Sequence, residues 1–344
     1  MTTRRTLMAL MGATALTLTA LPAAAQEVTL RMHQFLPGAA NVPKNILHVW
    51  ADTIEEASDG RIEIERYDAM ALGGTPPQLI DQVRDGVADI VWTLPGYTPG
   101  RFARAEVFEL PFMMTNAEAT SRAYWQLAEE TMLDDDFADF KVLGLWVHGP
   151  GIIHSAEPVD EVGDLDGMKL RAPTRATTTM FSDLGAAAVG MPVPAIPEAL
   201  SKGVIDATVI PWEVTGALKV AELVDNHTVF DEPLYTAAFV FAMNKDRYES
   251  LPDDLKAVID ENSGLEFSAF AGRTMEEDDG PARQIAVDRG NTIIELTAEQ
   301  TQEWRDASQA TIDAWIEEMD GKGMDGSGLI ERARALIDEN TGSM

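Results

Sequence analysis

The stretch DLDGMKLRAPTRATTTMFSDLGAAAVGMPVPAIPEALSKGVIDATVI, residues 164–210, decides the fold. It predicts a turn, a short strand, a helix, a second strand, a proline-bounded crossing, another helix and a third strand. Gly167 ends the turn, and the segment from Met168 to Arg171 is too short for anything but a strand end. Pro173 stops that strand, because proline has no backbone N–H to donate to a neighbouring strand. The alternation of strands and helices is typical of an α/β protein.

Arg171 is the strongest candidate for a functional side chain in this stretch. It lies at the tip of a strand, which is where open α/β sheets bind their ligands. A guanidinium group offers a rigid fork of donors that matches a carboxylate in two-point geometry. The alternative is an ordinary ion pair with a surface acid such as Asp166. We predict that Arg171 binds the anionic group of a ligand.

The composition limits the function classes. The chain has 344 residues, 45% of them hydrophobic, which is enough for two domains with buried cores. It has no cysteine, which fits an exported protein without disulfides and excludes thiol catalysis and thiolate metal sites. It has 57 acidic and 26 basic residues, a net charge of −31. Such a surface repels nucleic acid and anionic lipid, so neither is expected as a main partner.

The first 25 residues have the pattern of an export signal. Arg4 and Arg5 precede an apolar run at residues 7–21, and Ala23-Ala24-Ala25 offers a small-residue cleavage site. A membrane anchor is the alternative, but the run is short for a bilayer span. The paired arginines fit a twin-arginine signal and an ordinary Sec signal equally well. Cleavage near Ala25 would remove both arginines and no acid, and would place a mature protein of charge −33 in the periplasm.

The order of predicted elements along the chain indicates two lobes. Residues 28–93 follow the order β-α-β-α-β, which predicts a parallel sheet with helices on both faces. After a strand at 141–147 the chain is expected to enter a second lobe, which holds Arg171. A hydrophobic strand at 235–243 leads back to the first lobe. The largely helical segment 251–280, with a break at Gly280-Pro281, is long enough to run along both lobes.

We therefore predict an α/β, two-lobed fold of the kind found in periplasmic binding proteins. Each lobe is expected to be a sheet flanked by helices, with a long helix running along both. Lobe I is predicted to comprise residues 26–150 plus 240–281, and lobe II residues 151–239 plus 282–344. Residues 1–25 are the predicted signal peptide.

A family resemblance extends over essentially the whole chain after residue 26. The matching pieces, in order, are GVADI (86–90), ELPFMM (109–114), GMKLRAP (167–173), VGMPVP (189–194), ALSKGVID (199–206) and FAMNKDRYESLPDDLKAVID (241–260). Together they resemble the solute-binding subunit of tripartite ATP-independent periplasmic (TRAP) transporters. The resemblance implies that the arginine of the G-x-K-x-R motif, here Arg171, holds a ligand carboxylate. It also implies integral-membrane TRAP subunits as partners and lobe closure as the capture mechanism.

The sequence departs from the family at the second arginine that members often carry about twenty residues earlier. The corresponding stretch, Leu145 to Val159, contains no arginine, and His148 and His154 are its only basic side chains. As a metal pair they lack a third ligand at suitable spacing. A packed histidine is the favoured interpretation for each, and ligand contact by His154 is the alternative.

Apolar residues occupy the position where the family often has a ligand-binding asparagine. After the strand 206–210 the chain reads Ile210-Pro211-Trp212-Glu213, and Trp92 ends another strand that faces the same cleft. Core packing is the alternative for both tryptophans, but strand ends favour contact with a stacked or apolar ligand body. The predicted ligand-binding residues are Arg171, Trp212, Trp92, Ile210, His154, Phe35 and Glu213.

These residues favour a monocarboxylate with an apolar or aromatic body as the ligand. Binding of a C4-dicarboxylate or a sugar acid by the same fold is the first alternative, and the binding component of an ABC importer is the second. A secreted enzyme is a remote third, because the chain has no G-x-S-x-G, no H-E-x-x-H and no cysteine. We expect no cofactor and no metal, and a monomer.

Overall fold

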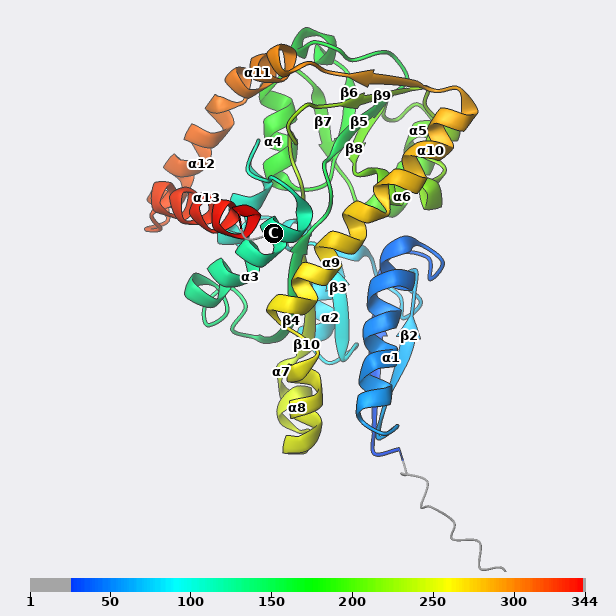
Figure 1. The fold of residues 1–344 in the computed structure, drawn as a ribbon, viewed down its shortest axis with the longest axis vertical. Helices are drawn as coiled ribbons and strands as arrows, with labels where there is room; N and C mark the ends of the chain where they lie inside the picture. Colours follow the sequence, from blue (N-terminus) through cyan, green and yellow to red (C-terminus); the bar gives the residue numbers. More distant parts are fainter. Residues whose placement is uncertain (1–25, 343–344) are drawn as a thin grey trace, which may run out of the picture.

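The computed structural model describes residues 26–342 and contains two β-sheets, each flanked by helices (Figure 1). The predicted signal peptide lies outside the described residues. The two-lobed α/β fold predicted from the sequence is confirmed. In Figure 1 the five-stranded sheet lies in the lower half of the molecule and the six-stranded sheet in the upper half.

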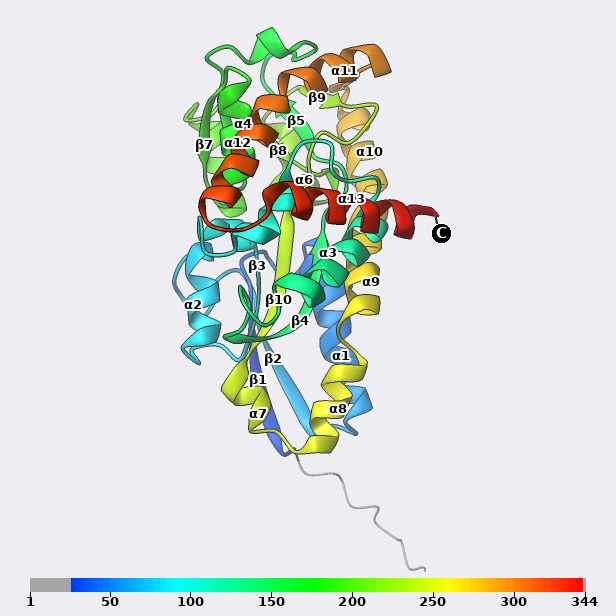
Figure 2. The same cartoon turned by 90° about the vertical axis from the view of Figure 1, so that its left-hand side faces the viewer.

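The first sheet has the strand order β2-β1-β3-β10-β4. β1 pairs in parallel with β2 and β3, which is the predicted β-α-β-α-β unit, whereas β10 is antiparallel to β3 and β4. Figure 2 shows α2 on one side of this sheet and α1 and α9 on the other. The strands are β1 (Val28–His33), β2 (Ile62–Tyr67), β3 (Ile90–Thr93), β4 (Phe140–Val147) and β10 (Ala238–Asn244). The helices around it are α1 (His48–Ala57), α2 (Leu79–Arg84), α3 (Ala117–Thr131), α7 (Lys245–Glu249), α8 (Asp253–Glu261) and α9 (Leu265–Glu277).

The second sheet has the order β11-β9-β5-β8-β6-β7 and contains the stretch that decides the fold. β6 is parallel to β7 and β8, and it ends at Ala172, directly before Pro173 as predicted. Its strands are β5 (Ile152–Ser155), β6 (Lys169–Ala172), β7 (Ala187–Gly190), β8 (Ala207–Ile210), β9 (Asn226–Val229) and β11 (Thr292–Glu295). The helices that follow or cover them are α4 (Arg175–Asp183), α5 (Ile196–Ser201), α6 (Trp212–Leu218), α10 (Asp279–Arg289), α11 (Ala298–Ala307) and α12 (Gln309–Gly321).

Helices α9 and α10 together form the predicted long helix along both lobes (Figure 1). α9 packs against α3 and β4 of the first lobe, and α10 packs against α6 and β11 of the second. The break lies at Asp278, two residues before the predicted Gly280-Pro281. Pro281 is tolerated in the first turn of α10, because the first four N–H groups of a helix have no partner within it.

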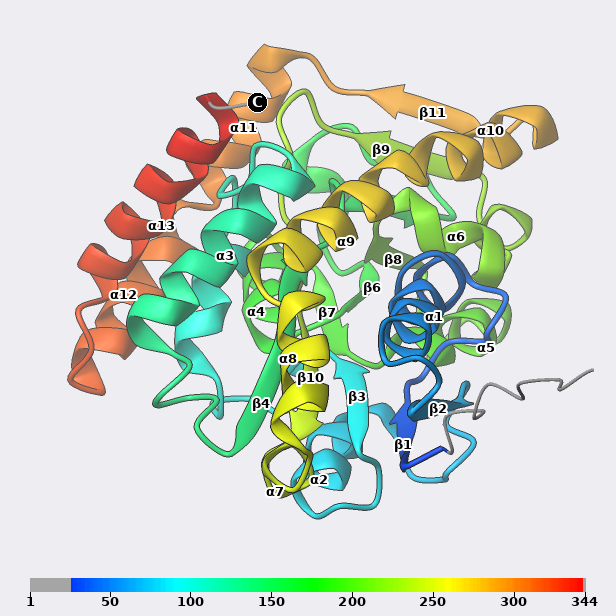
Figure 3. The same cartoon turned by 60° about the horizontal axis from the view of Figure 1, so that its bottom comes forward.

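The last helix, α13 (Gly326–Gly342), packs against α3 (Figure 3). The Asn340 amide donates to Gln126 Oε1 at 2.7 Å, and Arg332 pairs with Glu130 on α3. This placement differs from the predicted division, which assigns the whole of 282–344 to lobe II. We propose that 326–342 belongs with lobe I; the remaining lobe boundaries stay a prediction.

Candidate functional site

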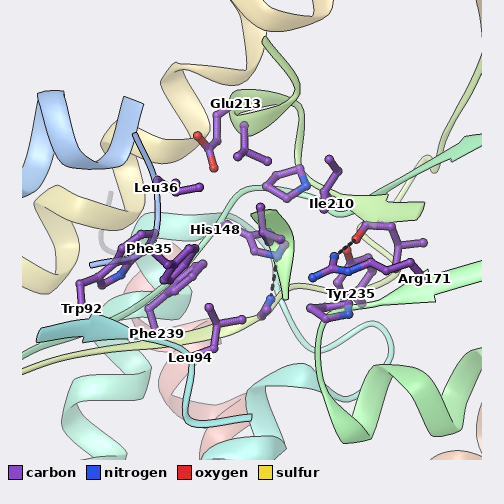
Figure 4. A pocket seen from close by; sticks show the side chains of 16 residues that line it. Phe35, Leu36, Trp92, Leu94, His148, Arg171, Ile210, Glu213, Tyr235 and Phe239 are labelled. Atoms are coloured by element: carbon purple, nitrogen blue, oxygen red, sulfur yellow. Dashed lines mark hydrogen bonds between the residues drawn. The ribbon is translucent and has the colours of Figure 1, made fainter. Parts of the chain in front are cut away.

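A cavity lies between the two sheets, at the edge where β3, β6 and β8 end (Figure 4). The empty space between its lining side chains is about 380 Å³, including solvent at its open side. The lining is almost entirely apolar, with Arg171 as its single permanent cation. The lining residues are Phe35, Leu36, Trp92, Leu94, His148, Arg171, Pro173, Val193, Val209, Ile210, Pro211, Glu213, Val214, Tyr235, Ala237 and Phe239.

Arg171 is fully buried in the lining and has no carboxylate partner among the described residues. Its Nε donates to Met191 O at 2.8 Å and its Nη1 to Val209 O at 3.0 Å, so two backbone carbonyls fix the plane of the guanidinium. Its Nη2 makes no hydrogen bond to any residue of 26–342. Burial lowers the pKa of Arg171, yet an arginine side chain stays charged in proteins. A buried cation without a counter-charge is costly, so the position is suited to an anionic ligand group.

Two tyrosines complete the surroundings of Arg171. The Tyr97 hydroxyl accepts the Val193 N–H at 3.1 Å and lies beside the Arg171 guanidinium. The Tyr235 hydroxyl is buried and has no hydrogen-bond partner among the described residues. Burial raises the pKa of Tyr235, so its O–H stays protonated and can donate. Arg171 Nη2 and Tyr235 therefore offer two unused donors next to the same cavity.

His148 contributes a neutral ring to the lining. Its Nδ1 is 2.5 Å from Gly149 O and its Nε2 accepts the Ala237 N–H at 3.0 Å, which fits the tautomer with hydrogen on Nδ1. Burial lowers the pKa of His148 to about 4. Both ring nitrogens are therefore occupied, and His148 does not replace the second arginine that the sequence lacks.

An aromatic wall forms the side of the cavity that belongs to the first sheet. Phe35 stacks on Trp92 with ring centroids 4.6 Å apart, and Phe239 stacks on the same indole at 5.0 Å. All three side chains are at most 5% exposed. A flat apolar ligand body would contact these rings without displacing any polar protein group.

The structure brings together five of the seven predicted residues: Arg171, Trp92, Ile210, Phe35 and Glu213. Whether they contact a ligand stays a prediction. Trp212 and His154 are corrections, because neither lines the cavity. They pack with His227 behind it, with centroids 4.9–5.0 Å apart. His154 lies on β5, in the middle of the sheet, with β8 and β9 as the neighbouring strands on either side. Its Nε2 is 3.2 Å from Ile210 O.

Tyr235, Phe239 and Ala237 line the cavity and were not found by sequence reasoning. That reasoning considered only the ends of strands, which meet at the ligand-binding edge of a parallel sheet. β10 is antiparallel to its neighbours, so its beginning lies at this edge instead. The available signal was an aromatic residue at the start of the predicted strand 235–243, three residues before β10 begins.

Glu109 is a buried carboxyl group at the junction of the lobes. Its Oε1 accepts the Ala238 N–H at 3.1 Å, and its Oε2 has no hydrogen-bond partner among the described residues. Burial raises the pKa of Glu109 to about 8, although hydrogen bonds with Thr174 and Ala238 oppose the shift. The neutral acid is therefore the form that the fold accommodates best.

We expect the folded protein to lose stability as the pH rises from about 4.5 to 8. The pKa of Glu109 is higher in the folded state than its ordinary 4.5, so its contribution is complete below about pH 4.5 and is lost as the pH rises through 8. Glu109→Gln should weaken this decline by up to about 1.4 kcal/mol per pH unit. Urea unfolding at pH 5, 6.5 and 8 measures the effect, with Glu63→Gln on the exposed face of β2 as the matched control. An unaltered decline in Glu109→Gln would contradict the assignment.

The comparisons with known proteins agree with this geometry. Residues 37–318 match the family model described as bacterial extracellular solute-binding protein, family 7. The chain belongs to this family. It is a TRAP periplasmic solute-binding subunit, as the resemblance implied. Within residues 26–342 no helix has the length and apolar character to span a bilayer, and no three His, Asp or Glu side chains are grouped so as to hold a metal ion.

Two solved TRAP solute-binding proteins are similar to this chain over nearly its whole length. One, from Rhodoferax ferrireducens and in complex with benzoate, is 50% identical, covers 92% of this chain and 99% of its own, and has a TM-score of 0.90. The other, from a marine metagenome and in complex with 3-hydroxybenzoate, is 46% identical, with coverage of 92% and 99% and a TM-score of 0.89. The C4-dicarboxylate-binding periplasmic protein DctP of Rhodobacter capsulatus is 26% identical over 89% of this chain and 92% of its own.

Proposed function

We propose that this TRAP receptor captures an aromatic monocarboxylate, with the carboxylate on Arg171 and the ring against Phe35, Trp92 and Phe239. The observation that carries the proposal is the cavity itself, in which one buried cation with an unused Nη2 faces an otherwise apolar, aromatic lining. The carboxylate would supply the missing counter-charge. The ring would contribute about 25 cal/mol for each Å² of apolar area that it buries.

The main alternative is a C4-dicarboxylate, the ligand class named for the Rhodobacter capsulatus relative. Its second carboxylate would find no second arginine in this lining and would be buried near the Glu213 carboxyl group. Each buried unsatisfied polar group costs about 1–3 kcal/mol, and a charged one more. A sugar acid carries several hydroxyl groups, and most of them would be left unpaired in this largely apolar lining. The more similar relatives, in complex with benzoate and 3-hydroxybenzoate, also favour the aromatic class.

Capture would proceed by closure of the lobes around the ligand. Contacts made only in the closed form shift the equilibrium toward it. The cavity is lined from both sheets, by Trp92 on β3 and Arg171 on β6, so a bound aromatic acid would connect the two. The acidic surface does not prevent binding, because surface charges are screened beyond roughly 8 Å at physiological salt, whereas a buried guanidinium is screened much less.

We further propose that the receptor acts as a monomer without catalytic activity and delivers its ligand to the membrane subunits of the transporter. Residues 1–25 have the pattern of an export signal with cleavage near Ala25. Such cleavage would leave a mature periplasmic protein, which supports this role. The enzyme alternative has little support, because the described lining residues include no nucleophile with an adjacent base. Membership of the TRAP family argues against the ABC-importer alternative.

A ligand panel tests the proposed function. Benzoate, 3-hydroxybenzoate and mandelate should raise the melting temperature of the purified protein and bind by calorimetry, whereas succinate, malate and galactonate should bind at least about tenfold more weakly. Branched-chain monocarboxylates are expected to be intermediate, because they bury less area against the rings. Stabilisation by succinate or galactonate, with none by aryl monocarboxylates, would show that the cavity has been misinterpreted.

A further inference from the structure

Glu213 places a carboxyl group in the lining that the binding of a simple carboxylate does not use. It belongs to the first turn of α6, is 4% exposed, and forms no ion pair among the described residues. Its Oε2 has no hydrogen-bond partner there. In Figure 4 Glu213 lies at the top of the group of lining side chains and Arg171 at its right. A ligand held by Arg171 can therefore extend toward Glu213.

The backbone of Glu213 is held firmly although its carboxyl group is not. Its N–H donates to Asp279 Oδ1 at 2.7 Å, and its carbonyl accepts from the Asn41 amide at 3.0 Å. Asp278, the second acid nearby, accepts from the Asn45 amide at 2.9 Å. The amides of Asn41 and Asn45, both in the first lobe, thus hold the backbone of Glu213 and the neighbouring Asp278 in place. The Glu213 side chain remains free to point into the cavity.

The protonated form of Glu213 is favoured in this environment. Burial, and secondarily the charges of Asp279 and Asp278, raise the pKa of Glu213 well above its ordinary value. A protonated carboxyl group has one O–H donor and retains an acceptor oxygen. It can exchange hydrogen bonds with a hydroxyl group, whereas it would give an apolar ring edge no favourable contact.

We propose that Glu213 is a specificity-determining residue that hydrogen-bonds a ring hydroxyl of the ligand, on the meta or para carbon remote from the carboxylate held by Arg171. This inference rests on the proposed function. It names hydroxylated aryl carboxylates as the preferred class within it. A site built to hydrogen-bond a hydroxyl group discriminates against the analogue without one, because its own buried polar group is then left unpaired.

The test compares the affinities of benzoate, 3-hydroxybenzoate and 4-hydroxybenzoate by calorimetry for three proteins: wild type, Glu213→Gln and Glu213→Leu. The measured quantity is the ratio of each hydroxybenzoate affinity to the benzoate affinity in the same protein. In the wild type, one of the two hydroxybenzoates should bind roughly tenfold more tightly than benzoate. Glu213→Gln, which keeps a donor and an acceptor, should retain most of that ratio, and Glu213→Leu should reduce it to about one. A purely structural role would change all affinities together and leave the ratio intact.

Three outcomes would overturn the inference. If the wild type binds benzoate and the hydroxybenzoates equally, Glu213 does not recognise a hydroxyl group, although the proposed function stands. If Glu213→Leu keeps the wild-type ratio, another residue recognises the hydroxyl group, and the proposed function again stands. If none of the three acids binds the wild type, the proposed function fails and the inference fails with it.

Discussion

Arg171→Ala is expected to lose about 30-fold to several thousand-fold in affinity for an aryl carboxylate, because it leaves a buried carboxylate without its cation. The guanidinium is fully buried, fixed by Met191 O and Val209 O, and has Nη2 unused. In the described part of the chain, no other arginine or lysine lines the cavity to take its place. Calorimetry with benzoate measures the loss. The ligand-free variant should remain folded, because removing an unpaired buried charge also removes its desolvation cost.

Arg171→Lys should recover little of this affinity, since an ammonium group cannot reproduce the two-point geometry of the fork. Lys202→Ala is the matched control for a change of one positive charge, because Lys202 is exposed and pairs with Glu198 on the surface of α5. Wild-type affinity in Arg171→Ala would exclude Arg171 from the site.

The sequence was sufficient for the fold because its local signals agree with one another. Thr297-Ala298-Glu299-Gln300 has the pattern of a capping box, and the box forms at the start of α11, where the Gln300 N–H donates to Thr297 Oγ1 at 3.3 Å. Asn116 likewise caps α3 by accepting the Ala119 N–H at 2.8 Å. The break in the long helix was harder to predict. Proline and glycine indicate a boundary, yet a proline in the first turn loses no helical hydrogen bond, so the boundary lies at Asp278 instead.

Only the site residues that lie at or directly after the end of a strand could be predicted from the sequence. Arg171 and Trp92 follow from the rule that ligands lie at the carboxyl ends of parallel strands. Beyond the end of a strand, the conformation of the next turn decides whether a side chain faces the cavity or the core. Pro211 is extended, with φ −70° and ψ 165°, and Trp212 as the first residue of α6 packs on Ile152 and Ala282 instead of the cavity. Tyr235 depends on the antiparallel pairing of β10, which no local signal reports.

The two lobes approach each other closely at Gly96. This residue lies in the 3₁₀ turn after β3, and Thr174 of the second lobe lies directly opposite. A Cβ atom on Gly96 would lie 2.5 Å from Thr174 Cγ2 and 2.7 Å from Thr174 Cβ. Thr174 cannot easily move aside, because it is buried and its side chain caps α4 by accepting the Thr177 N–H. The added methyl group therefore opposes the approach of the two lobes.

Gly96→Ala is accordingly expected to weaken ligand binding by about 5-fold to 150-fold, the equivalent of the 1–3 kcal/mol that overpacking costs. If the lobes separate when no ligand is bound, the open form avoids the clash, so the melting temperature without ligand should stay close to that of the wild type. Calorimetry gives the affinity, and small-angle scattering with and without benzoate gives the extent of closure, which should decrease. Gly280→Ala is the matched control, because a Cβ there meets nothing within 4 Å. Wild-type affinity together with full closure in Gly96→Ala would mean that the lobes need not approach this closely for capture.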